Sequence, residues 1–93
     1  MSVYIDDAEH AFGQMKMCHM FADSTTELFE MVDEIGVARK WIQLPGTYHE
    51  HFDVCKSKRR LAVKAGAIEI TERQTGERMR ERRLGGWLPP ASC

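Results

Sequence analysis

Residues 48–53 of the 93-residue chain carry side chains of a kind that performs chemistry, because His49, His51 and Asp53 stand at alternate positions. Alternate side chains of an extended chain share one face, so these three would point one way while Phe52 points into the core. Imidazole nitrogens and carboxylate oxygens together bind divalent metals, or supply a general base with an acid that orients it. The alternative is a polar loop in which Asp53 caps the next helix.

Two further residues of the same chemical type lie beside apolar segments. His19 stands within MCHMFA, residues 17–22, where a histidine is typically a hydrogen-bonded core residue and joins a site only if it faces His51. Asp6 ends residues 2–6, and carboxylates at strand ends border the crevice of many α/β proteins, although they also occur in turns. His51, Asp53 and His19 are therefore the catalytic candidates, and Asp6, His51 and Asp53 are the candidate ligands of a divalent metal.

A basic cluster follows at once, formed by Lys56, Ser57, Lys58 and Arg59. It lies at the expected start of a helix, where free backbone N–H groups, a hydroxyl and cationic side chains together bind phosphate. We therefore expect these four residues to bind a phosphorylated ligand. The alternative is a solvated basic face that pairs with acidic residues elsewhere in the chain.

Five arginines, at 73, 78, 80, 82 and 83, form a second basic segment, but three glutamates interleave with them and Trp87 is the only aromatic residue nearby. Nucleic-acid-binding segments usually have fewer acids and more aromatic residues that stack on bases. The pattern favours an exposed helix, at a subunit contact for instance, over a nucleic-acid interface.

The elements that must position these residues can be predicted in order. Residues 2–6 form a short strand whose Val3 and Ile5 face opposite to Tyr4 and Asp6, residues 7–16 a loop, and residues 17–22 a buried strand. A helix then begins after Ser24, which matches a capping box with Glu27, and ends at Gly36.

The second half of the chain is less regular. Residues 37–44 fit a short strand or a helical turn, Pro45-Gly46 predicts a turn, and residues 47–53 look extended. A second helix is expected within residues 54–65, capped by Asp53 or Ser57, then a strand over 67–71 and a third helix over 72–83. This order predicts the α/β class: a small single-domain sandwich, with a short mixed β-sheet and two to three helices, over residues 1–83. Residues 84–93 would be a flexible or surface-docked tail, attached through Trp87.

Composition excludes several classes of protein. Hydrophobic residues make up 43% of the chain and charged residues 29%, a normal globular balance, and no apolar run reaches the roughly 20 residues of a membrane helix. Three cysteines without CxxC spacing, and an N-terminus without signal-peptide character, favour a reducing, cytoplasmic setting and no membrane partner.

Charge and size both point to association. Residues 1–55 carry ten acidic and three basic side chains, whereas residues 56–93 carry four acidic and ten basic ones. The two halves could pair within one chain or between two chains, or the basic half could bind an anion. A chain this short buries only about 60–65% of its unfolded surface, so we expect a homo-oligomer or a bound ligand to support the core.

Four segments together resemble the small phage and bacterial family catalogued as domain of unknown function 4031. They are residues 3–7 (VYIDD), residues 17–23 (MCHMFAD), residues 51–59 (HFDVCKSKR) and residues 65–71 (AGAIEIT). The resemblance covers most of residues 2–72 and implies cytosolic proteins without an assigned activity. The positions that match its motif are Asp6, His19, His51, Asp53 and Arg59, which implies a shared polar pocket; His49 lies outside the motif.

Together these observations predict a binder of a small phosphorylated ligand, a nucleotide above all, in a polar pocket of histidine, aspartate and arginine side chains. A metal-assisted hydrolysis of a phosphoester would need a general base or metal-bound hydroxide and cationic charge. The alternatives are a non-enzymatic protein that sequesters a nucleotide, as a phage protein would, and a homo-oligomeric module for protein interaction.

Overall fold

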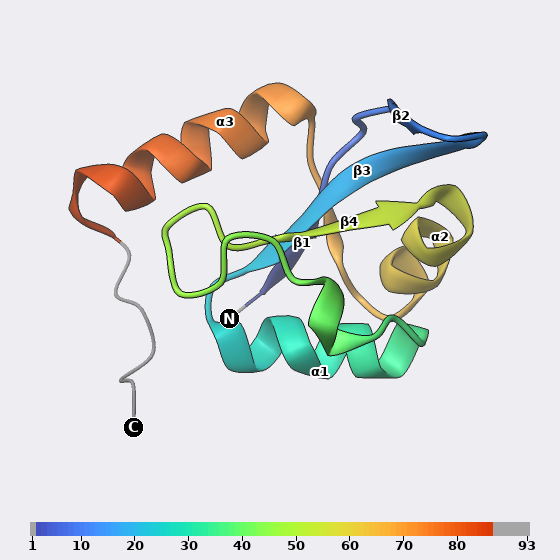
Figure 1. The fold of residues 1–93 in the computed structure, drawn as a ribbon. Helices are drawn as coiled ribbons and strands as arrows, with labels where there is room; N and C mark the ends of the chain where they lie inside the picture. The colour runs from blue at the N-terminus through green and yellow to red at the C-terminus, as the bar shows by residue number, and fades with distance from the viewer. Residues whose placement is uncertain (1, 87–93) are drawn as a thin grey trace.

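A computed structural model describes residues 2–86. The strands are β1 (Val3–Ile5), β2 (His10–Phe12), β3 (Met15–Ala22), β4 (Phe52–Cys55) and β5 (Ile68–Glu69). The helices are α1 (Thr25–Ile35), α2 (Lys56–Lys64) and α3 (Glu72–Glu81), with a short 3-10 turn, η1 (Arg39–Trp41), and a wide helical turn, η2 (Arg82–Gly86) (Figure 1). The expected α/β class, with a mixed sheet and three helices, is confirmed.

The sheet is organised around β3, its longest strand. One edge of β3 pairs with β4, and the other pairs with β1 along Met20–Ala22 and with β2 along Met15–Met17, all antiparallel. The strand β5 adds to β1 in parallel. Residues 6–9 leave the sheet between β1 and β2, and this short excursion places Asp6 beside the middle of β3.

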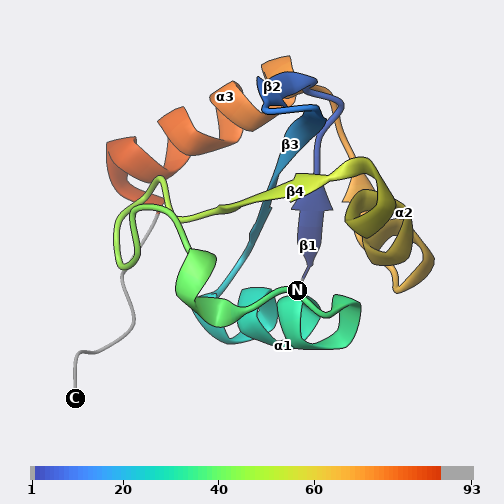
Figure 2. The ribbon, with the colours of Figure 1, turned by 45° about the vertical axis from the view of Figure 1, so that its right-hand side comes forward.

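Helices cover both faces of this sheet (Figure 2). On one face, alternate residues of β1, β3 and β4 pack against α1 and α2, and Ile5, Met20 and Phe52 are completely buried there. On the other face, Tyr4 and Phe21 pack under Met79 of α3. The period of two along each strand separates these faces, as the sequence predicts for Val3 and Ile5 against Tyr4 and Asp6.

The helix α1 forms where its end signals place it. The Ser24 hydroxyl accepts the N–H of Glu27, but the Glu27 carboxylate bonds to the Ser24 hydroxyl rather than to its backbone, so the expected reciprocal capping box is incomplete. A complete capping box occurs instead at α3, between Thr71 and Gln74. Gly36 ends α1 with φ 79°, a left-handed conformation that only glycine adopts without strain.

Replacing Gly36 by alanine is expected to lower the free energy of unfolding by about 1 kcal/mol, because of the positive φ. The new Cβ would also lie 3.2 Å from Nζ of Lys58, which donates to the Ile35 carbonyl. Gly76→Ala is the matched control, since this glycine lies inside α3 with open space around it and should gain up to about 1 kcal/mol. Urea denaturation of both variants checks the opposite signs.

Three local expectations are wrong. Residues 7–16 are not a plain loop, because Gly13, with φ 61°, turns β2 back onto β3. Residues 47–49 form turns rather than an extended segment, and pairing begins only with the bridge between Gln43 and His51. Neither Asp53 nor Ser57 caps α2: Cys55 is the N-cap residue, and its side chain makes no capping hydrogen bond.

Arginines of the second basic segment hold α3 on the sheet. The guanidinium of Arg78 lies over the ring of Tyr4 at 4.2 Å, and that of Arg82 lies over Phe21 at 4.9 Å. Arg82 also donates to the Ala22 carbonyl. These two arginines therefore have a packing role within the chain.

The expected boundary at residue 83 falls within η2, which also includes residues 84–86 of the predicted tail. Trp87 and residues 88–93 lie outside the described residues. Among residues 2–86, no helix is both long and apolar enough to cross a membrane.

Candidate functional site

Three of the residues singled out in the sequence meet on the face of the sheet that carries α3. His19 of β3 lies directly opposite Asp53 of β4 in the antiparallel register, so both side chains stand on one face. His51, two residues before Asp53, shares that face. The rings of His19 and His51 lie 5.5 Å apart between centroids, and Nε2 of His51 lies 3.4 Å from Oδ1 of Asp53.

The Asp6 carboxylate fixes the orientation of the His19 ring. This carboxylate is completely buried and accepts the backbone N–H groups of Ala8 and His19, the hydroxyl of Thr75, and Nδ1 of His19 at 2.8 Å. Burial raises the pKa of Asp6, but the hydrogen bonds from His19, Thr75 and Ala8 together outweigh it and leave the pKa at about 2. Asp6 is therefore ionised at neutral pH and can only accept hydrogen bonds.

The protonation of both rings follows from these partners. Because Asp6 only accepts, Nδ1 of His19 carries a hydrogen, and the neutral ring keeps its lone pair on Nε2. Nδ1 of His51 lies 2.6 Å from the carbonyl oxygen of His49, which also only accepts, so the lone pair of His51 is on Nε2 as well. A histidine held through one nitrogen by a carboxylate or a carbonyl is the usual arrangement of a metal ligand.

Ligand-type atoms of His19, His51 and Asp53 lie close together. One potential ligand atom of each lies within 4.8 Å of the other two. Bonds of about 2.0–2.2 Å to a metal bring such atoms within roughly 4.4 Å of one another, so a small rotation of the half-exposed Asp53 side chain completes the set. Two imidazoles and one carboxylate suit a divalent transition metal and leave coordination positions open.

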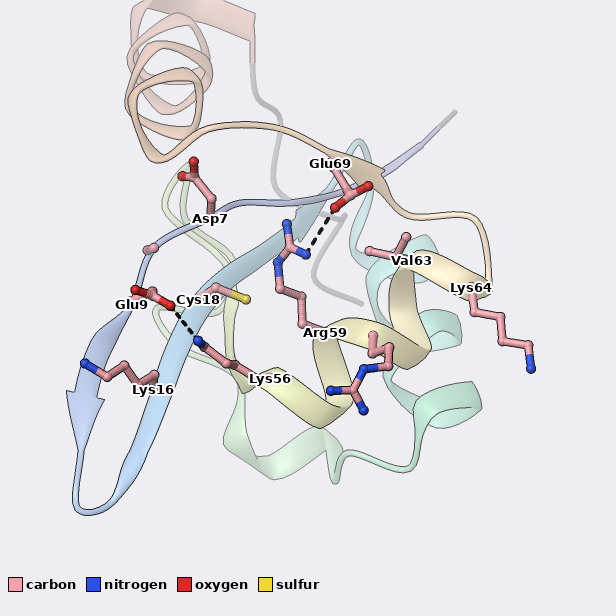
Figure 3. A pocket seen from close by; sticks show the side chains of 11 residues that line it. Asp7, Glu9, Lys16, Cys18, Lys56, Arg59, Val63, Lys64 and Glu69 are labelled. Atoms are coloured by element: carbon pink, nitrogen blue, oxygen red, sulfur yellow. Dashed lines mark hydrogen bonds and ion pairs between the residues drawn. The ribbon is translucent and has the colours of Figure 1, made fainter.

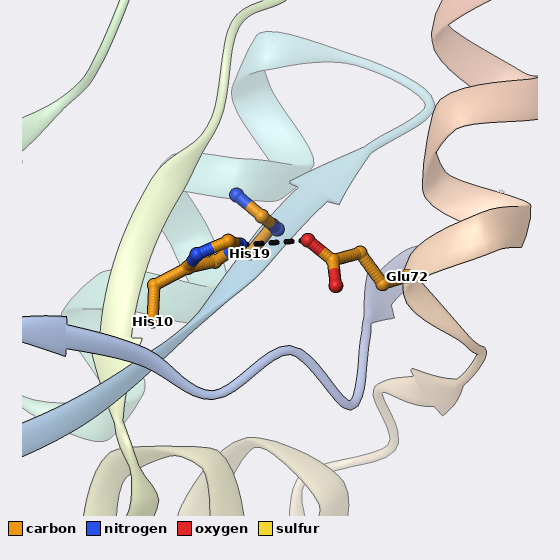
Figure 4. Close-up of side chains that lie close together, drawn as sticks. All are labelled: His10, His19 and Glu72. Atoms are coloured by element: carbon orange, nitrogen blue, oxygen red, sulfur yellow. Dashed lines mark hydrogen bonds and ion pairs between the residues drawn. The ribbon is translucent and has the colours of Figure 1, made fainter.

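Two residues that were not predicted from the sequence flank this set. His10 of β2 and Glu72, the first residue of α3, also lie close to His19, and Nε2 of His10 is 2.6 Å from Oε2 of Glu72 (Figure 4). With His19 they form a second group whose potential ligand atoms lie within 4.8 Å of one another. Nε2 of His10 already donates to Glu72, so we take His19, His51 and Asp53 as the principal site. Reading Gly13-Gln14 as a hairpin turn would have placed His10 beside His19.

The other predicted site residues have different places. Asp6 is a predicted metal ligand, but it lies behind His19 with its oxygens engaged. His49 lies in a turn and lines a cavity beside His19 and His51, but in the described chain it belongs to neither group of converging ligand atoms.

The basic cluster lies on the opposite face of the sheet from the histidines. Lys56 and Arg59 of α2 line a groove of about 680 Å³ with Lys16 and Cys18, whose side chains alternate with His19 along β3 (Figure 3). Lys56 pairs with Glu9, and Arg59 pairs with Glu69 and donates to the Asp6 carbonyl. Lys58 binds the carbonyl at the end of α1, and Ser57 lies 3.2 Å from the Cys55 thiol. The structure therefore does not bring the expected histidine, aspartate and arginine side chains into one pocket.

The fold and the cluster define a small α/β sandwich with a histidine–carboxylate cluster between its sheet and α3. The chain belongs to the family described as protein of unknown function (DUF4031), whose family model matches residues 3–82. The resemblance carried by the four sequence segments is thereby confirmed. Comparison with curated proteins finds no match, and comparison with solved structures finds none either.

Proposed function

We propose that this protein binds one divalent transition-metal ion through His19, His51 and Asp53 and uses it to hydrolyse a phosphoester of a small phosphorylated ligand. The observation that carries the proposal is that Nδ1 of each histidine is held by an acceptor, which leaves Nε2 of each ring free, and that ligand-type atoms of both histidines and of Asp53 lie close together. A metal-binding histidine usually has an acceptor at its other ring nitrogen, whereas a histidine in a core or a loop does not need one.

The reaction follows from the open coordination positions. A divalent ion held by three protein ligands lowers the pKa of bound water and polarises a phosphoryl oxygen. The lysines and arginines of α2 lie across the sheet, so on this face the ion itself would supply the positive charge that the phosphate needs. We therefore place the phosphoryl group at the ion and assign the α2 cluster no role in catalysis.

The test begins with chelator-stripped protein that is titrated separately with Zn²⁺, Mn²⁺, Co²⁺ and Ni²⁺, with native mass spectrometry as the readout. One ion per chain is expected for at least one metal. The loaded protein is then incubated with bis(p-nitrophenyl) phosphate and a panel of nucleotides, and product is followed by absorbance and chromatography. Failure to bind any of the four metals would overturn the proposal; binding without turnover of any substrate would reduce it to a metal-binding role.

Metal affinity is expected to rise with pH. The hydrogen bond that His19 donates to Asp6 raises the pKa of His19 against the opposing effect of burial, so below that pKa the ion must displace a proton from His19. Below the pKa of His19, affinity should fall about tenfold per pH unit for each proton released. Isothermal titration at pH 6 and pH 8 checks this prediction, and an affinity that does not change with pH would contradict it.

The basic groove favours a second candidate, a protein that binds a phosphorylated ligand without turnover. Lys56, Arg59, Arg60 and Lys64 all line that groove, and its volume suits a small ligand. Acidic residues also line it and pair with Lys56 and Arg59, which weakens the attraction for a phosphate. If this candidate holds, Arg60→Ala should weaken nucleotide binding while His51→Ala leaves it unchanged.

A further inference from the structure

An apolar groove of about 510 Å³ opens beside the histidine–carboxylate cluster. His19, Asp53 and His10 contribute polar side chains to its lining, so two residues of the proposed metal site also line the groove. Its apolar lining includes Phe12 of β2, Met15 of β3 and Trp41 of η1.

Two aromatic side chains of this lining are unusually open to solvent. Phe12 is 67% exposed and Trp41 is 60% exposed. Segments far apart in the sequence, residues 10–17 and residues 37–43, present these side chains to one cavity. Exposed aromatic side chains that converge on a concave site are a common feature of ligand binding, whereas isolated exposed apolar residues are ordinary.

We infer that this groove binds the nucleobase of a nucleotide whose phosphate lies at the proposed metal site. The inference rests on the proposed function, because the cluster fixes where the phosphate would be. A planar base suits Trp41, Phe12 and Met15, since aromatic side chains stack on every base. The volume fits a drug-sized ligand and is small for a folded protein segment, and Gln43 at the wall adds an amide that could hydrogen-bond the edge of the base.

The test compares adenosine 5′-monophosphate with ribose 5-phosphate, which shares the sugar and phosphate but lacks the base. Each is titrated into the full chain loaded with whichever metal it binds, or into the stripped chain if it binds none, by isothermal titration calorimetry. The nucleotide is expected to bind at least about tenfold more tightly, in line with the stacking of one base. Trp41→Ala should remove this preference, and Trp41→Phe should retain most of it. Leu61→Ala, which truncates an exposed residue of α2, is the matched control and should change nothing.

The two proposals fail separately in this design. Equal affinity for the two ligands, or no binding of either, overturns the inference; if the metal still binds, the metal site itself stands. A nucleotide preference that persists in Trp41→Ala also overturns it. Sedimentation of the free protein covers one further outcome: a dimer that dissociates in Trp41→Ala would show that a second copy covers the groove and would overturn nucleobase binding there. Loss of metal binding with the nucleotide preference intact would overturn the proposed function alone.

Discussion

Replacing His51 by alanine is expected to abolish metal binding and phosphoester hydrolysis while leaving the fold intact. His51 supplies one of the three converging ligand atoms, and removal of a ligand should exceed the roughly 10–100-fold loss typical when only a ligand's hydrogen-bond partner is removed. Within residues 2–86, the side chain makes one hydrogen bond, to the His49 carbonyl, so the loss of stability should be about 1 kcal/mol. Native mass spectrometry, calorimetry and urea denaturation measure the three effects.

His49→Ala is the matched control for this experiment. It removes an imidazole two residues away but keeps the backbone carbonyl that orients His51. We expect it to bind one ion with nearly unchanged affinity. A His51→Ala protein that still binds one ion, or a His49→Ala protein that loses its ion to the same extent, would contradict the assignment of His19, His51 and Asp53.

The second large effect is expected for Asp6→Asn, in stability and in metal affinity together. The Asp6 oxygens accept four hydrogen bonds in a completely buried position, and an asparagine amide would direct N–H groups at some of those donors. The substitution leaves buried donors unpaired and removes the charged partner of His19, so the free energy of unfolding should fall by about 2–4 kcal/mol. Metal affinity should fall about 10–100-fold, because an amide N–H at Nδ1 of His19 favours the tautomer whose Nε2 carries a hydrogen.

The pH dependence of Asp6→Asn gives a check with a defined sign. The folded pKa of Asp6, about 2, lies below the ordinary value of 3.8, so ionised Asp6 stabilises the fold fully above pH 3.8, and this contribution is lost as the pH falls through 2. The shift corresponds to about 2 kcal/mol. The stability difference between the wild type and Asp6→Asn should therefore narrow between pH 5 and pH 2 in urea denaturation.

Asp7→Asn is the control, because this exposed neighbour accepts one hydrogen bond, from the backbone N–H of Glu72. It should cost less than about 1 kcal/mol and leave metal affinity unchanged. A stability difference for Asp6→Asn that stays constant from pH 5 to pH 2 would show that Asp6 is not held ionised by its partners.

The sequence predicted those helices and strands that are determined by residues close together in the chain. The helix α1 follows from Ser24 at its start, Gly36 at its end and apolar residues at helical spacing between them, all within one short segment. The strand β3 is an apolar run, and alternation along β1 correctly separated Val3 and Ile5 from Tyr4 and Asp6. The hairpin at Gly13 was missed because exposed β2 has no apolar alternation to reveal it.

The candidate cluster was predicted in part. The spacing of His51 and Asp53 places both on one face of an extended strand wherever that strand lies, so their proximity is a local property. That His19 faces them depends on the register between β3 and β4, and that Glu72 lies nearby depends on where α3 crosses the sheet. Both are contacts between residues distant in sequence, which spacing along the chain does not specify.

The sequence by itself determined the α/β class, the family, the course of α1 and the types of residue that gather at the site. Only the tertiary structure decided which of these residues meet. Helix α2 packs on the face of the sheet that carries Ile5, Met20 and Phe52, because these apolar side chains must be covered. Its basic residues Lys56 and Arg59 therefore lie across the sheet from His19. Strand alternation then turns the Asp6 side chain toward His19. Asp6, which was predicted to bind the metal, therefore orients His19 instead.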